Sequence, residues 1–128
     1  MRLLLDTHTF IWFIEGHPDL SALAKKLIED PKNERFLSIA SLWEIAIKTS
    51  LGRLNLNPSI QQLVDDHVYG NAIDLLPIAP SCLDRLANLV FYHKDPFDRL
   101  IIAQAMVEKL TIVGKDGLFA GYDVDCVW

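Results

Sequence analysis

The stretch Leu3-Leu4-Leu5-Asp6, near the start of the chain, decides the fold. Three consecutive leucines predict a strand that is buried on both faces, because a half-exposed strand would alternate apolar and polar side chains. Such a strand lies inside a parallel sheet that is covered by helices on both sides. Asp6 then falls at the carboxyl edge of the sheet, where open α/β folds bind their ligands. An alternative stays open, since an Asp at this point can simply cap the next helix.

Strand and helix patterns alternate along the rest of the chain. The expected strands after the first are residues 35–38, 72–78, 111–113 and 124–127. The expected helices follow Asp6, open at Ser21, at Ser41 and at Asn57–Ser59, and run from Pro80 to Leu89 and from Phe97 to Leu110. This alternation favours an α/β fold with a parallel sheet joined by right-handed crossovers.

The bulk composition is that of an ordinary globular protein. At 128 residues the chain is expected to form one domain, residues 1–128, with a core that needs no disulfide or metal. A net charge of −5 gives no basic footprint of a non-specific nucleic-acid binder, although it does not exclude nucleic acid. Cys82 and Cys126 lack metal-ligand spacing, which fits reduced thiols. With no apolar run of membrane-spanning length and no signal-peptide pattern, we expect a cytoplasmic protein without a membrane partner.

Four acidic residues are expected near one edge of the sheet. Asp6 and Asp116 each follow a predicted strand, whereas Glu44 and Asp98 fall in the first turns of predicted helices. Strand ends and helix N-termini meet at the same edge of a parallel sheet, so all four can reach one pocket. Close carboxylates repel one another, and a hard divalent cation such as Mg²⁺ or Mn²⁺ removes the repulsion. A cation held in this way can activate water at a phosphodiester, which makes hydrolysis of a nucleic-acid backbone the expected chemistry.

Each of these acids also has a purely structural alternative. Glu44 can pair with Lys48 one helical turn later. Asp98 at the third helical position favours the helix dipole whether or not it binds a metal. Asp116 can be an ordinary turn residue. Asp95, just before Pro96, is expected to be the N-cap of the helix rather than part of the site.

Residues beside the acids leave further alternatives open. The Thr7 hydroxyl can orient a ligand or water, or cap the first helix. Arg99 can contact a phosphate, or it can be a solvated surface arginine. Trp12, Trp43 and Phe97 can stack on bases, although packing in the core or in a dimer is the simpler expectation.

Four segments resemble the PIN-domain ribonucleases, and most closely the VapC-type toxins of bacterial toxin–antitoxin modules. They are LLLDTHTFIW (residues 3–12), SIASLWEIAIKTSLGRL (38–54), HKDPFDRLIIAQA (93–105) and GKDGLFAGY (114–122). The resemblance implies an α/β/α sandwich that cleaves RNA with magnesium or manganese. It implies catalytic, metal-binding roles for Asp6, Glu44, Asp98 and Asp116. It also implies an antitoxin partner, and homodimers are common in the family.

The chain departs from the family pattern at one place. Many members carry Ser or Thr shortly before the last acid, where this chain has Gly114 and Lys115.

Three rival functions make different demands on the sequence. An aspartyl phosphatase needs a second acid two residues after the first, where this chain has His8. A receiver-like signalling domain needs an Asp at the end of a middle strand, where this chain has Ser38. A degenerate PIN fold that only binds partners stays open until activity is measured.

Overall fold

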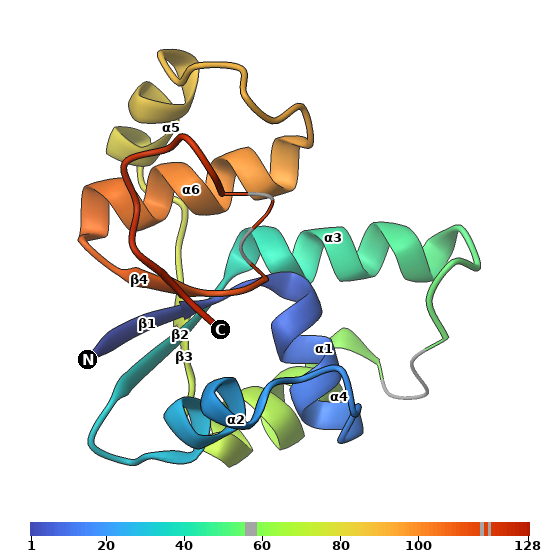
Figure 1. The fold of residues 1–128 in the computed structure, drawn as a ribbon. Helices are drawn as coiled ribbons and strands as arrows, with labels where there is room; N and C mark the ends of the chain where they lie inside the picture. Colours follow the sequence, from blue (N-terminus) through green and yellow to red (C-terminus); the bar gives the residue numbers. More distant parts are fainter. Residues whose placement is uncertain (56–58, 116, 118) are drawn as a thin grey trace.

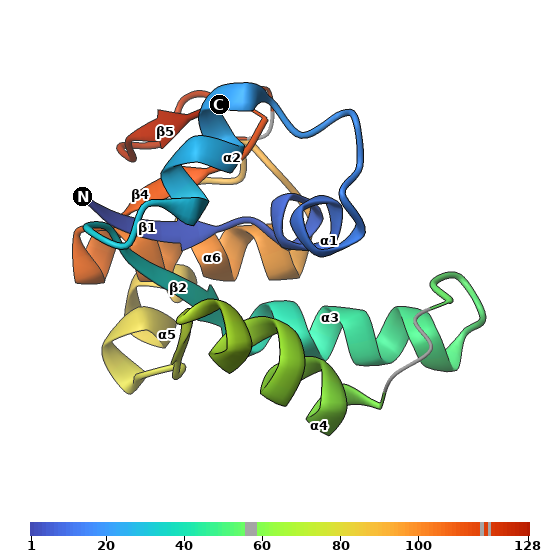
Figure 2. The ribbon, with the colours of Figure 1, turned by 90° about the horizontal axis from the view of Figure 1, so that it is seen from below.

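A five-stranded parallel sheet forms the centre of the computed structural model, which describes residues 1–55, 59–115, 117 and 119–128. The strands are β1 (Arg2–Leu5), β2 (Glu34–Ser38), β3 (Asp74–Leu76), β4 (Thr111–Val113) and β5 (Cys126–Val127). Their order is β3-β2-β1-β4-β5, and every neighbouring pair is parallel. Figure 2 shows β2, β1, β4 and β5. The first strand therefore lies at the centre of the sheet, as predicted.

Helices cover the sheet on both sides, so the predicted α/β/α fold is confirmed (Figure 1). On one side lie α1 (Thr7–Glu15), α2 (Ala22–Glu29) and α4 (Ile60–Leu63), which continues into a π-helical turn (Val64–Val68) and a 3₁₀ turn (Tyr69–Asn71). On the other side lie α5 (Pro80–Ala87) and α6 (Pro96–Glu108). Helix α3 (Ile39–Ser50) extends from the end of β2. Within the described residues, no helix is long and apolar enough to cross a membrane.

The leucines of β1 divide between two hydrophobic clusters, one on each face of the sheet. Leu3 and Leu5 pack with residues of α1, α2 and α3, whereas Leu4 packs with Ile101 and Ile102 of α6. All three leucines are fully buried. This explains why the strand shows no alternation of polar and apolar residues: neither face of β1 meets solvent.

Some predicted boundaries are wrong. Helix α3 begins at Ile39 and not at Ser41, because Ser38 is the N-cap and its hydroxyl accepts a hydrogen bond from the Ala40 N–H. Glu44 consequently lies in the second turn of α3, not in the first. Four strands differ from their predicted bounds: β1 and β2 each begin one residue earlier, and β3 and β5 are shorter than predicted. The predicted start of the fourth helix includes Asn57 and Pro58, which lie outside the described residues; its N-cap is Ser59.

Candidate active site

Asp6 stands where the central strand ends and α1 begins. Its backbone N–H donates to the Val113 carbonyl of β4 at 3.1 Å, and its own carbonyl accepts from the Phe10 N–H of α1. Asp6 occupies the N-cap position, but its side chain makes no capping hydrogen bond. The side chain is only 4% exposed, and its buried Oδ1 atom has no hydrogen-bond partner among the described residues. The N-cap position of Asp6 therefore does not account for this oxygen, and a buried carboxylate oxygen without a hydrogen-bond partner remains to be explained.

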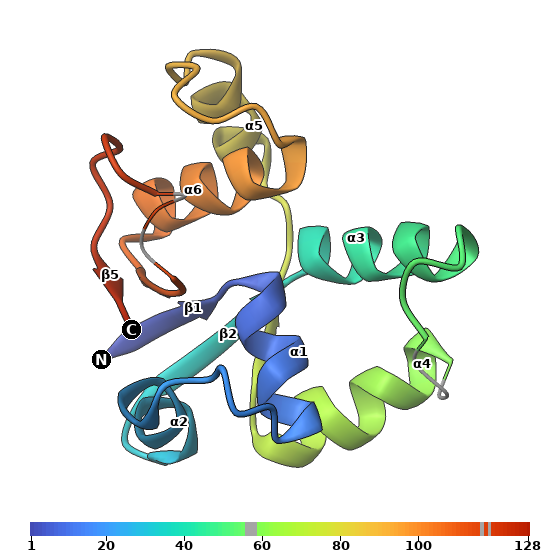
Figure 3. The same ribbon diagram turned by 45° about the vertical axis from the view of Figure 1, so that its right-hand side comes forward.

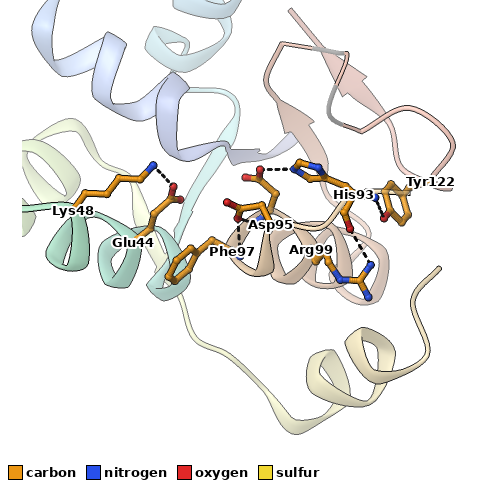
Figure 4. Close-up of polar contacts among 8 residues, drawn as sticks. Glu44, Lys48, His93, Asp95, Phe97, Arg99 and Tyr122 are labelled. Carbon is orange, nitrogen blue, oxygen red and sulfur yellow. Dashed lines mark hydrogen bonds and ion pairs between the residues drawn. The ribbon is translucent and has the colours of Figure 1, made fainter. Parts of the chain in front are cut away.

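Glu44 reaches the same edge of the sheet from α3, which starts beside α1 (Figure 3). It is 4% exposed, and its Oε2 atom lies 2.6 Å from the Lys48 ammonium one turn later (Figure 4). Its Oε1 atom is buried and has no hydrogen-bond partner among the described residues. The ion pair with Lys48, one of the alternatives from sequence, thus exists, but it accounts for only one of the two carboxylate oxygens.

The two acids at the start of α6 have different surroundings. Asp95 is the N-cap, as predicted: its Oδ1 atom accepts from the N–H groups of Phe97 and Asp98 at 2.9 and 3.0 Å. Asp98 lies at the third helical position, and its Oδ2 atom is 2.7 Å from Nε2 of His93. The carboxylate of Asp95 is therefore used within its own helix, whereas that of Asp98 contacts a side chain from the preceding loop.

Burial and the charges of neighbouring acids raise the pKa of Asp6 and of Asp98. Burial, followed by the charges of Asp98 and Glu44, raises the pKa of Asp6 from 3.8 to about 7, against a smaller opposing effect of the Thr7 and His8 N–H groups. Burial also raises the pKa of Asp98; the hydrogen bond from His93 opposes this, and the charges of Asp95 and Glu44 add to it. Asp6, Glu44 and Asp98 are thus close enough to act on one another electrostatically.

The donor set fits a hard divalent cation. Carboxylate oxygens are the ligands that Mg²⁺ and Mn²⁺ prefer, and the two buried oxygens without partners, on Asp6 and Glu44, lack the compensation that a cation supplies. As placed, however, no three acidic, histidine or cysteine side chains among the described residues are arranged to hold a metal. Lys48 engages one oxygen of Glu44 and His93 engages one oxygen of Asp98, so two of the three carboxylates are already held by neighbouring side chains in this arrangement. The fourth predicted acid, Asp116, lies outside the described residues.

The chain after β4 passes directly against Asp6. A Cβ atom on Gly114 would lie 3.1 Å from the Asp6 Cβ atom and 2.9 Å from the Phe119 ring, so a larger residue does not fit without rearrangement. This contact gives a steric reason for the glycine at position 114, which lies close to where many family members carry Ser or Thr. Beside it lies a pocket of about 350 Å³, lined by Asp6, His8, Thr9, Trp12, Lys115 and Gly117.

The structure decides several of the alternatives for neighbouring residues. The Thr7 hydroxyl donates to the Ser41 hydroxyl at 2.9 Å, which links α1 to α3 and leaves no capping role. Arg99 is not a surface arginine, since it is 5% exposed and its guanidinium donates to backbone carbonyls. Trp43 is 55% exposed and packs edge-on against Phe97, so it belongs to the surface and not to the core.

Two residues at the site were missed from the sequence. They are His93, which precedes the helix of Asp98, and Tyr122, which lies in the segment between β4 and β5. A signal for His93 exists in hindsight, because it stands five residues before Asp98 at the start of the HKDPFDR segment. No local pattern indicates Tyr122, which reaches the site only through tertiary structure.

An all-parallel sheet with carboxylates gathered at the end of its central strand defines an α/β protein with an acidic site at the sheet edge. The chain belongs to the PIN domain family, whose model matches residues 3–124. PIN domains are generally nucleases. None of the curated proteins compared with the chain matches it.

Solved structures share the fold at low sequence identity. VapBC2 from Rickettsia felis, bound to a DNA fragment from its promoter, aligns over 99% of this chain and 98% of the other, with a TM-score of 0.69 and 17% identity. A toxin–antitoxin complex from Klebsiella pneumoniae aligns over 98% and 96%, with a TM-score of 0.66 and 20% identity. VapBC-1 from nontypeable Haemophilus influenzae aligns over 99% and 97%, with a TM-score of 0.66 and 16% identity.

Proposed function

We propose that this protein is a magnesium- or manganese-dependent endoribonuclease and the toxin of a VapBC-type toxin–antitoxin pair, acting on RNA in the cytoplasm. The observation that carries the proposal is the pair of buried, uncompensated oxygens on Asp6 and Glu44 beside Asp98. Membership of the PIN family supports a nuclease. Solved toxin–antitoxin complexes of the same fold support the narrower toxin assignment.

Asp6, Glu44 and Asp98 would hold the cation, with Asp116 as the proposed fourth acid. When bound there, a divalent ion would offset the carboxylate charges and would supply Lewis acidity for water and for the charge on the phosphate. The protein's own contribution is to hold these acids in place: β1 fixes Asp6, α3 fixes Glu44 and α6 fixes Asp98. Burial excludes bulk water from Asp6 and Glu44, which strengthens their interaction with a cation.

RNA cleavage in the presence and absence of a cation tests the nuclease proposal. Purified protein incubated with structured RNAs should cleave them in magnesium or manganese, stop in excess EDTA and recover when the cation is restored. The reason is that neighbouring carboxylates at neutral pH repel a phosphodiester unless their charge is offset. Cleavage that continues in excess chelator would show that the metal-dependent mechanism is wrong. Cation binding without cleavage of any RNA would favour the degenerate, partner-binding alternative.

Exposed apolar side chains on α3 support the proposed antitoxin and the proposed homodimer. Trp43 and Ile47 are exposed on this helix, and Leu51 is exposed at its C-cap. Exposed apolar side chains that lie together commonly mark a protein interface. Light scattering at micromolar concentration should give a dimer, and co-expression with the product of the adjacent reading frame should give a stable complex that no longer cleaves RNA. A monomer that forms no such complex would contradict both partner assignments.

A further inference from the structure

Arg99 fixes the loop between α5 and α6 from inside the protein. Its guanidinium donates to the carbonyls of Leu89, Val90 and His93 at 3.1, 2.9 and 3.3 Å, and it lies 3.8 Å from the centre of the Phe91 ring. Among the described residues it forms no ion pair with an acid. A buried cation whose hydrogen bonds all go to one loop is an anchor for the backbone of that loop.

Tyr122 fixes the same loop from the other side. Its hydroxyl accepts a hydrogen bond from the His93 N–H at 2.9 Å (Figure 4). The same hydroxyl donates to the Val90 carbonyl at 2.8 Å. Its ring meets that of Tyr92 edge-on, 5.3 Å between centroids. Gly121 lets the two segments approach, because a Cβ atom there would lie 3.1 Å from the Tyr92 ring. The backbone of His93 is thus held at both its N–H and its carbonyl.

The consequence appears at Asp98. The His93 ring projects from this fixed backbone and engages Oδ2 of Asp98 at 2.7 Å, while Oδ1 of Asp98 makes no hydrogen bond to the described residues. The contact is largely shielded, since the two side chains are 24% and 15% exposed. Hydrogen-bond partners of metal-binding carboxylates fix the orientation of those carboxylates, and their loss typically weakens metal binding.

We infer that His93 is a positioning residue: held by Arg99 and Tyr122, it donates Nε2–H to Asp98 and aims the other carboxylate oxygen at the cation proposed above. The inference rests on the proposed function, in which Asp98 holds that cation. It also assigns Arg99 to the support of this loop and not to RNA. His93 touches neither RNA nor the cation and acts only through Asp98.

The test is Mn²⁺ binding to the full chain, measured by electron paramagnetic resonance, together with RNA cleavage kinetics and thermal unfolding. His93→Leu removes the donor and should weaken Mn²⁺ binding about 10- to 100-fold, with kcat reduced more than KM is changed. His93→Gln keeps an N–H donor and should recover most of the affinity. His67→Leu is the matched control, because the His67 side chain makes no hydrogen bond to the described residues, and it should bind Mn²⁺ like the unaltered protein.

Two results would overturn the inference. One is unchanged Mn²⁺ affinity in His93→Leu. The other is equal weakening in His93→Leu and His93→Gln together with a lowered melting temperature, which would make His93 a residue of general stability. If the unaltered protein binds no Mn²⁺, this inference and the metal site both fail. If it binds Mn²⁺ but cleaves no RNA, the proposed function fails, and the affinities of the variants still decide the role of His93.

Discussion

Replacing Asp6 by asparagine should make the metal-free protein more stable at alkaline pH. The folded protein raises the pKa of Asp6 from 3.8 to about 7, mainly through burial and then through the charges of Asp98 and Glu44. Between these two values the folded state keeps a proton that the unfolded chain has lost. The free energy of unfolding therefore falls as the pH rises from about 4 to about 7, and the loss is full above that range.

The structure sets the size of this effect. Each tenfold change in a proton-binding constant corresponds to about 1.4 kcal/mol, so the pKa change amounts to about 4 kcal/mol near pH 8. Asparagine removes the charge but leaves a buried amide, whose unpaired groups cost about 1 to 3 kcal/mol. We therefore expect the free energy of unfolding of Asp6→Asn to exceed that of the unaltered protein by about 1 to 3 kcal/mol near pH 8. The gain should shrink by about 2 to 3 kcal/mol near pH 5, where the folded protein already carries the proton.

Urea unfolding in EDTA at both pH values measures this effect. Asp84→Asn, on the exposed surface of α5, is the control and should change stability by less than about 0.5 kcal/mol at either pH. Saturating MgCl₂ should stabilise the unaltered protein and not Asp6→Asn, because only the folded protein with its acids intact binds the cation. A difference between Asp6→Asn and the unaltered protein that stays the same at both pH values would refute the electrostatic account of Asp6.

The remaining predictions concern α3 and α6. Asp95→Asn should keep the N-cap and most RNA cleavage, and should lower the free energy of unfolding by less than about 1 kcal/mol. Asp98→Asn should reduce RNA cleavage by orders of magnitude. The opposite result in a cleavage assay would show that the site on α6 is wrongly assigned. Lys48→Met removes the ammonium group that pairs with the buried Glu44, and it should lower the free energy of unfolding by about 1 to 3 kcal/mol in EDTA. MgCl₂ should restore most of this stability in thermal melts. Arg99→Lys cannot reach all its carbonyls and should cost about 1 to 3 kcal/mol by urea unfolding, and equal stability would contradict its anchoring role.

The fold could be predicted because its central strand carries a local signal. Leu3, Leu4 and Leu5 are buried on both faces, and burial on both faces is what removes the alternation of side chains along a strand. The position of Asp6 follows from the same signal, since the strand must end where the first acid appears. Asp95 was also predictable, because an N-cap acts within its own helix turn.

Other parts of the site depend on contacts between distant segments. Ser38 and Ser41 are both acceptable helix caps, and only the approach of Thr7 from α1 shows that the Ser41 hydroxyl is already engaged. Arginine is usually a surface residue, but Arg99 is buried because the backbone carbonyls of the loop before α6 surround its guanidinium. Tyr122 reaches that loop from the C-terminal segment. No pattern of local spacing encodes these meetings.

The central place of β1 has a consequence for the order in which the molecule folds. The strand is made before both of its partners in the sheet: β2 follows about 30 residues later, and β4 follows only after more than 100 residues. Asp6 meets Asp98 only once α6 has docked, and its backbone is tied down only when β4 supplies the Val113 carbonyl. Parallel pairing across such long sequence separations is slow. A chain in which α6 and β4 have not yet been made and docked therefore lacks the assembled acidic cluster, so Asp6 is synthesised well before it comes to lie beside Asp98.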